Sequence, residues 1–158
     1  MHKLSRILLH TVKSKMQNSK NVLNSNEIEL LGASLHKIEQ KLIKKTNQDG
    51  TQRIWYQGEE PYFDIFFDLL DSEIIWFQFT LRAKSLSWDN KRRELQTGVT
   101  NELKVDDVSF YAATKTIEAD EKTDQNFLEL VKAILQTRCE EEIFKKALLL
   151  FDEATSSN

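Results

Sequence analysis

Residues 62–82, YFDIFFDLLDSEIIWFQFTLR, decide the fold because they contain two strand-like runs that meet at a turn. Apolar side chains recur at every second position of each run, and successive side chains of a strand point to opposite faces. The runs therefore predict an antiparallel hairpin with one apolar face and one mixed face. The apolar face consists of Phe63, Ile65, Phe67, Leu69, Ile75, Phe77, Phe79 and Leu81.

The length of the loop between the two runs sets the register of this hairpin. A two-residue loop at Asp71 and Ser72 places Phe67 beside Trp76 and mixes the two faces. A three-residue loop that also includes Glu73 keeps the apolar side chains together, and each one that becomes buried contributes about 1.5–3 kcal/mol. We therefore predict the three-residue loop. It pairs Leu69 with Ile75, Phe67 with Phe77, Ile65 with Phe79 and Phe63 with Leu81, and on the mixed face Tyr62 with Arg82, Asp64 with Thr80, Phe66 with Gln78 and Asp68 with Trp76.

The composition predicts one globular domain over residues 1–158. The chain is 40% hydrophobic and 30% charged, and its four Gly and one Pro leave little room for linkers. No apolar stretch has the length of a transmembrane helix, and no signal peptide is apparent. A single cysteine, Cys139, excludes an internal disulfide and suits a reducing compartment. We therefore expect a soluble cytoplasmic protein.

Outside the hairpin, the periodicity predicts helices at both ends of the chain and further strands between them. Helical spacing of apolar residues indicates helices over residues 3–18 and 24–45, the second capped by Asn24. Strand-like runs over 51–57 and 94–99, and a shorter one over 108–112, bring the antiparallel meander to four or five strands, with residues 84–88 at the end of a strand. The predicted fold is α+β, with two N-terminal helices, this meander and a C-terminal helical segment.

The C-terminal segment begins at Thr123 or Asp124 and carries two apolar stripes on nearly opposite sides of an ideal helix. One straight helix cannot bury both stripes against one sheet. Either the helix breaks near residues 137–142, or its last part packs on the first helix or on a second subunit. The second alternative leaves a homodimer through the C-terminal helix open.

Charge and motif patterns count against nucleic-acid, metal and cofactor binding. Residues 1–45 hold nine Lys and Arg against three acidic residues, which indicates a basic helix face. That face is the one candidate for nucleic acid or for an anionic membrane, but no aromatic residues are interleaved with it, so we do not expect nucleic acid to bind. His2, His10 and His36 lack metal-site spacing, and the isolated glycines form no phosphate loop, so no metal or cofactor is expected.

One short motif points to catalysis. Glu102-Leu103-Lys104 resembles the acid-x-Lys motif of restriction-like nucleases, in which two carboxylates hold Mg²⁺ and the lysine positions water. The resemblance implies a second carboxylate from Asp64 or Asp68. These four residues form the catalytic alternative, a Mg²⁺-dependent nuclease.

The mixed face of the hairpin is the candidate binding surface. Tyr62, Phe66, Trp76 and Arg82 lie there among polar residues, and aromatic residues and Arg are enriched in the contact centres of protein interfaces. The face serves this role if the helices leave it uncovered. Small acidic domains of helix–sheet–helix architecture are typical of binding modules such as secretion chaperones or toxin-immunity proteins. We therefore expect a non-catalytic protein-interaction module with a protein partner.

Overall fold

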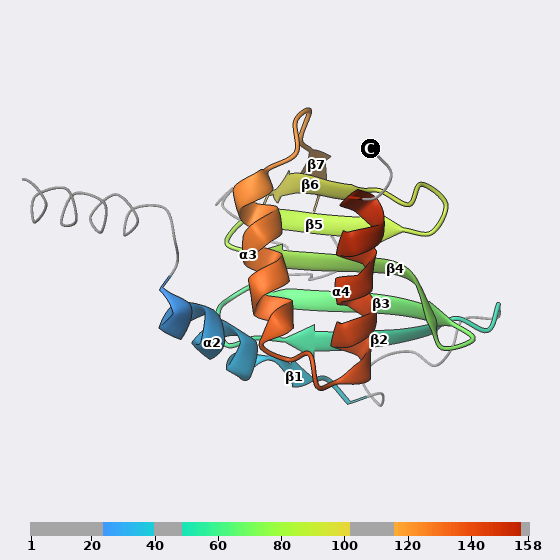
Figure 1. Ribbon diagram of the computed structural model, residues 1–158, viewed down its shortest axis with the longest axis horizontal. Helices are drawn as coiled ribbons and strands as arrows, with labels where there is room; N and C mark the ends of the chain where they lie inside the picture. Colours follow the sequence, from blue (N-terminus) through green and yellow to red (C-terminus); the bar gives the residue numbers. More distant parts are fainter. Residues whose placement is uncertain (1–23, 40–48, 102–115, 156–158) are drawn as a thin grey trace, which may run out of the picture.

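The computed structural model describes residues 24–39, 49–101 and 116–155. Two predicted elements, the helix over 3–18 and the strand over 108–112, lie outside these ranges. The described part of the chain is an α+β fold in which one antiparallel sheet carries a pair of helices on one face and a third helix at its edge (Figure 1).

The described ranges form a seven-stranded sheet in which every strand pairs antiparallel with its neighbours in sequence. The prediction of four or five strands was therefore too low. One reason is the turn at Arg82 and Ala83, where both φ angles are positive (51° and 63°) and no Gly or Asn marks the turn. The strands are β1 (His36–Lys37), β2 (Gln52–Gln57), β3 (Asp64–Leu70), β4 (Glu73–Leu81), β5 (Lys84–Asp89), β6 (Leu95–Thr100) and β7 (Ile117–Ala119).

The predicted register of the central hairpin is correct over most of its length and wrong at the turn. Phe67 pairs with Phe77, Ile65 with Phe79 and Asp68 with Trp76, as expected. The loop, however, has two residues, Asp71 and Ser72, and Leu69 pairs with Ile74. Ile75 is the extra residue of a β-bulge, and the bulge shifts the register by one position. Because of this shift, the apolar side chains near the turn and those farther along the hairpin lie on the same face. Ile74 is consequently buried in place of Ile75.

The first described helix, α2 (Ser25–Ser34), starts as predicted but ends eleven residues before its predicted end at Lys45. Asn24 is its N-cap, and its side chain accepts from the backbone N–H of Asn26. The chain becomes extended at Leu35 (ψ 122°) and continues into β1. Of the two predicted N-terminal helices, the one over 3–18 lies outside the described residues, and the one over 24–45 is shortened because the chain beyond Ser34 joins the sheet edge.

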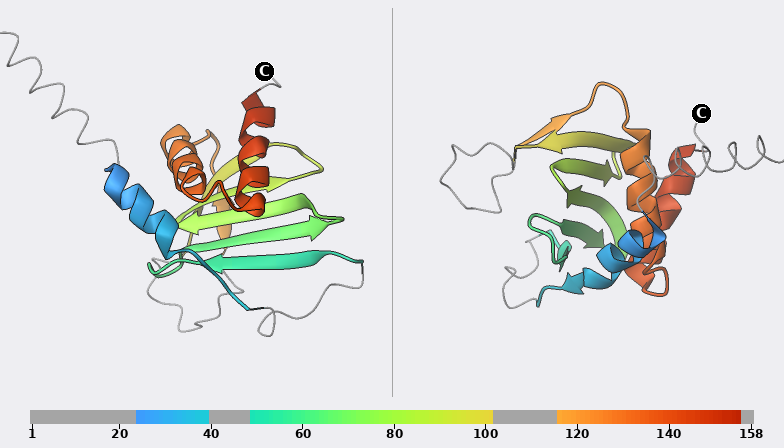
Figure 2. Two further views of the ribbon diagram at one scale, coloured as in Figure 1. Left: turned by 60° about the horizontal axis from the view of Figure 1, so that its bottom comes forward. Right: turned by 90° about the vertical axis from the view of Figure 1, so that its left-hand side faces the viewer.

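The predicted break in the C-terminal segment is confirmed. It separates α3 (Gln125–Gln136) from α4 (Glu142–Thr155), and Asp124 caps α3 by accepting from the N–H of Phe127 (3.0 Å). The two helices lie side by side on the same face of the sheet (Figure 2). The break therefore lets both stripes reach one core, including Phe127 and Val131 from α3 and Phe144 and Phe151 from α4.

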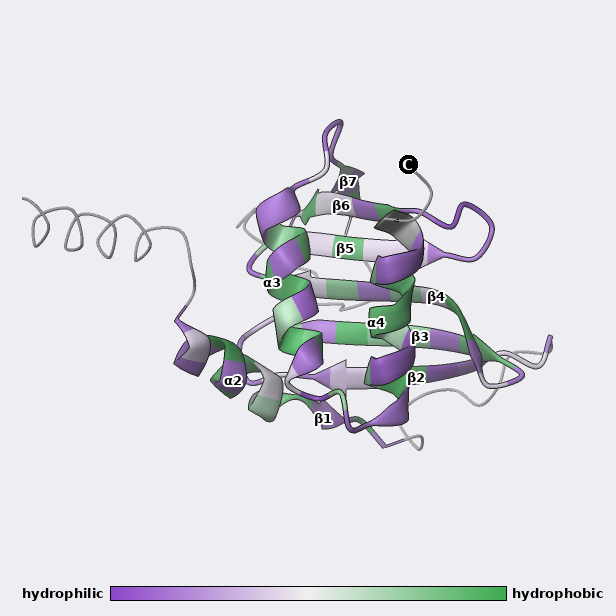
Figure 3. Cartoon of the chain, viewed as in Figure 1, coloured by the Kyte–Doolittle hydropathy of each residue, from purple (hydrophilic) through white to green (hydrophobic). Residues whose placement is uncertain are grey.

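The core lies between this helix pair and the apolar face of the sheet. Hydrophobic and hydrophilic residues alternate along both helices and along the central strands (Figure 3). Six of the eight predicted hairpin core residues are at most 1% exposed, namely Phe63, Ile65, Phe67, Phe77, Phe79 and Leu81. Leu69 is half-buried and packs against the core. Side chains at the intervening strand positions point to the opposite face, where the candidate site lies.

Candidate interaction surface

The mixed face of the sheet points away from α3 and α4, and in the described ranges no helix lies on it (Figure 2). Cross-strand pairing fixes which side chains meet there. Trp55 of β2 is opposite Phe66 of β3, and Arg53 is opposite Asp68, which is in turn opposite Trp76 of β4. Adjacent strands bring such pairs to roughly 5 Å between Cβ atoms. The pairing therefore gathers three aromatic rings and a guanidinium on three neighbouring strands.

These planar groups stack in an order that we call the aromatic ladder: Trp55, Phe66, Arg53 and Trp76. The rings of Trp55 and Phe66 are nearly parallel, with centroids 5.5 Å apart and an interplanar angle of 16°. The guanidinium of Arg53 lies over Phe66 at 5.8 Å and over Trp76 at 5.2 Å from the ring centroids. The near-parallel ring pair has a separation typical of favourable aromatic contacts, and the two Arg53 contacts are favourable because the negative face of a ring attracts a cation.

Ion pairing and hydrogen bonding hold both ends of the aromatic ladder. Arg53 donates to both oxygens of Asp68, from Nε at 2.7 Å and from Nη2 at 2.9 Å. This bond to Asp68 raises the pKa of Arg53. At the other end, Nε1 of Trp55 donates to Oδ1 of Asp64 (2.9 Å), a carboxylate that is only 5% exposed. The three aromatic rings are half-buried, so the ladder is a preordered surface rather than a set of loose side chains.

The structure places two of the four predicted binding residues, Phe66 and Trp76, in the aromatic ladder. Tyr62 and Arg82 are elsewhere because both have positive φ (61° and 51°) and lie outside the strands. Arg82 donates to Glu60 and to Glu27 of α2, at 2.7 and 2.8 Å. The bond from Arg82 lowers the pKa of Glu60, and the bonds to Glu60 and Glu27 raise the pKa of Arg82. Arg82 therefore links α2 to the end of the sheet.

Two members of the aromatic ladder, Arg53 and Trp55, were not among the predicted site residues. The signal was present in the strand over 51–57, where Arg53, Trp55 and Gln57 alternate with Ile54 and Tyr56. Carrying the hairpin register across to this strand would have placed Trp55 on the mixed face. The prediction stopped at the hairpin and so missed half of the cluster.

The catalytic alternative has two of its four residues in the described ranges. Asp64 accepts the Trp55 hydrogen bond and Asp68 pairs with Arg53, while Glu102 and Lys104 lie outside. Among the described residues, no group of three or more His, Cys, Asp and Glu is arranged to hold a metal ion. Cys139 is exposed in the turn that follows α3.

Comparisons with models of protein families, with curated proteins and with solved structures found no match to this chain. Within the described ranges, no helix combines the length and the apolar character that crossing a membrane requires.

Proposed function

We propose that this chain is a non-catalytic protein-interaction module that binds a protein partner through the aromatic ladder on the mixed face of β2, β3 and β4. In general role it is comparable to a secretion chaperone or an immunity protein. The observation that supports the proposal is the stacked set Trp55, Phe66, Arg53 and Trp76 on a face that no described helix covers. Aromatic residues and Arg dominate the binding energy of protein interfaces.

The geometry favours binding over chemistry. The guanidinium of Arg53 is oriented by Asp68 and by two rings, so little side-chain entropy remains to be lost when a partner docks. The exposed fraction of the Arg53 side chain is still 46%, which leaves it accessible. The neighbouring carboxylates of Asp64 and Asp68 accept hydrogen bonds from Trp55 and Arg53. These partners make the carboxylates part of the scaffold of the surface.

A test requires the partner and matched surface variants. The full chain with a purification tag is used to isolate partners from the cells that produce it, and the affinity of the recovered complex is measured by calorimetry. Trp76→Ala and Arg53→Ala should each weaken binding by about 30-fold or more, as expected for contact centres. Leu149→Ala is the matched control, because Leu149 is 55% exposed on α4 at the opposite face. Circular dichroism confirms that each variant is folded.

Two results would contradict the proposal. In the first, the ladder variants and Leu149→Ala bind with the same affinity as the unaltered chain. In the second, Leu149→Ala weakens binding while Trp76→Ala does not, which would move the contact to the helix face.

A further inference from the structure

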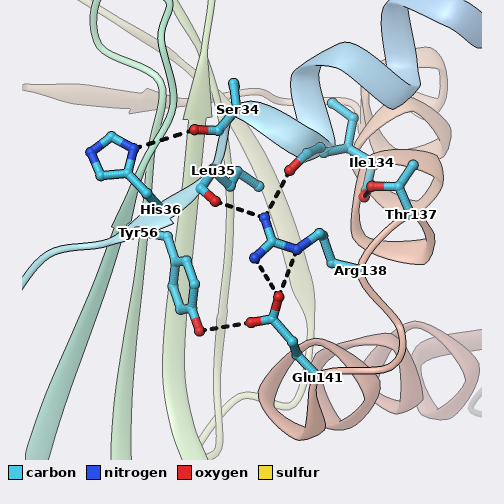
Figure 4. Close-up of polar contacts among 9 residues, drawn as sticks. Ser34, Leu35, His36, Tyr56, Ile134, Thr137, Arg138 and Glu141 are labelled. Carbon is cyan, nitrogen blue, oxygen red and sulfur yellow. Dashed lines mark hydrogen bonds and ion pairs between the residues drawn. The ribbon is translucent and has the colours of Figure 1, made fainter.

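The turn between α3 and α4 binds the C-terminal end of α2. Nη1 of Arg138 donates to the carbonyl oxygen of Leu35 at 2.7 Å (Figure 4) and to that of Gly32 at 2.9 Å. Carbonyl groups in the last turn of a helix lack an intrahelical partner, and the helix dipole places partial negative charge there. The guanidinium therefore supplies a cap that is charged and comes from a part of the chain about a hundred residues away.

The same guanidinium is held from its other side. Nε and Nη2 of Arg138 donate to Oε1 of Glu141, and the hydroxyl of Tyr56 donates to Oε2 of Glu141 at 3.1 Å. Tyr56 belongs to β2 and is only 6% exposed. The hydrogen bonds from Tyr56 to Glu141 and from Arg138 to Glu141 thus orient the guanidinium so that it points to the end of α2 (Figure 4). We call these three residues the latch.

The rest of α2 and β1 is less firmly attached. Of the ten residues of α2, Leu31 and Gly32 are buried, and Leu35 follows directly after the helix. Both residues of β1 are exposed, and they form only two residue pairs with β2. Segments with few buried apolar contacts open locally more readily than the core of a domain. The segment from α2 through β1, residues 25–37, has these properties and joins the sheet next to the latch.

We propose that residues 25–37 form a strap that opens as one unit, and that Arg138 is the residue that keeps it closed. Opening removes β1 from Tyr56 and Gln57 and exposes the backbone edge of β2, the strand that carries Arg53 and Trp55. A bare strand edge pairs readily with an extended segment of another chain. The strap thereby regulates access of a partner strand to the border of the aromatic ladder; this regulatory role rests on the proposed function.

Hydrogen exchange of the full chain without a partner tests the latch independently of that function. The reporters are the backbone amides of the last turn of α2 and the amide of Ile38, which donates to the carbonyl oxygen of Trp55 next to the β1–β2 pairing. In Arg138→Gln these amides should exchange roughly 10- to 100-fold faster, because two charge-assisted hydrogen bonds are lost. Amides of β3 and β4 should keep their protection. Lys84→Gln is the matched control, because the ion pair of Lys84 with Asp124 (2.8 Å) lies outside residues 25–37. It should leave Ile38 unchanged.

Glu141→Gln provides a second variant if Arg138→Gln does not fold. It retains the size of the side chain but removes the charge that orients Arg138, so it should accelerate exchange in the same residues by a smaller factor. Unchanged protection of residues 31–38 in the variants would overturn the proposal. Equal loss of protection in residues 31–38 and in β3 and β4 would also overturn it, because the segment would then unfold with the core. If the strap opens as expected but partner binding is unaffected by the ladder variants, only the proposed function fails.

Discussion

The hydroxyl of Tyr56 on β2 donates a 3.1 Å hydrogen bond to Oε2 of Glu141, in the turn between α3 and α4. This bond joins residues 85 positions apart and is the polar counterpart of the apolar contact between Tyr56 and Phe144, whose ring centroids are 4.9 Å apart. Burial first, and then the negative charge of Glu141, raise the pKa of Tyr56 from 10.0 to about 12. The phenol is therefore held in its neutral form by the fold.

The first prediction concerns stability at high pH. Because the folded-state pKa of Tyr56 is raised, its stabilising contribution is fully present below pH 10 and is lost as the pH rises from 10 to about 12. The free energy of unfolding should fall over this window by up to about 2–3 kcal/mol more in the unaltered chain than in Tyr56→Phe. Denaturant titrations of both proteins below and within the window measure the difference. Equal pH dependence of the two proteins would contradict it.

The second prediction concerns the close approach of α2 to the end of α3. A Cβ added to Gly32 would lie 1.8 Å from Oγ1 of Thr137, and that hydroxyl is already fixed by its 2.6 Å bond to the carbonyl oxygen of Ile134. Gly32→Ala should therefore lower the free energy of unfolding by about 1–3 kcal/mol. Denaturant unfolding measures the change, with Glu29→Ala on the exposed side of α2 as a control expected to stay within about 0.5 kcal/mol.

A double variant separates steric conflict from an effect of Ala on the helix itself. Thr137→Ala removes the oxygen at 1.8 Å but leaves the Thr137 Cβ position 2.9 Å from the new atom. The destabilisation by Gly32→Ala should consequently be smaller in the Thr137→Ala background than in the unaltered chain. Strict additivity of the two substitutions would show that they do not conflict sterically.

The parts of the fold that the sequence predicted correctly are those in which burial dominates. The pairing of Phe67 with Phe77 and the break before Glu142 both follow from the need to put large apolar side chains on one side of a sheet. The end of α2 could not be predicted in this way. It depends on Arg138 and Thr137, which are more than a hundred residues away, and local periodicity continued past Ser34.

The residues of the candidate site were likewise predicted correctly only where strand alternation determines their position. Phe66 and Trp76 were found because strand alternation places them on the mixed face, and Trp55 was missed because the hairpin register was not extended to β2. Arg82 was assigned to that face on the assumption of a continuous strand. Its positive φ belongs to a two-residue turn without Gly or Asn, which residue preferences do not indicate.

The third prediction concerns the tight turn of the central hairpin. Asp71 and Ser72 both have positive φ (50° and 66°), a conformation that costs an L-residue about 1–2 kcal/mol and glycine much less. Ser72→Gly should raise the free energy of unfolding by about 0.5–1 kcal/mol, after the greater chain entropy of glycine is subtracted. The contact with Lys146 survives because Nζ binds the backbone oxygen of Ser72 (2.6 Å). Thermal and denaturant unfolding measure the gain; Ser72→Ala, which keeps a Cβ, should show none.

The fourth prediction distinguishes a core role from a subunit contact for the C-terminal stripe. Phe151 is 2% exposed and its ring centroid lies 6.5 Å from that of Phe77 in β4, so its stripe is used inside the domain. Phe151→Ala should lower the free energy of unfolding by about 3–5 kcal/mol. Leu149→Ala, two residues away and 55% exposed, should change it by less than about 0.5 kcal/mol. Light scattering beside the unfolding curves decides between the roles: a Phe151→Ala chain of undiminished stability but lower molar mass would assign the stripe to a second subunit.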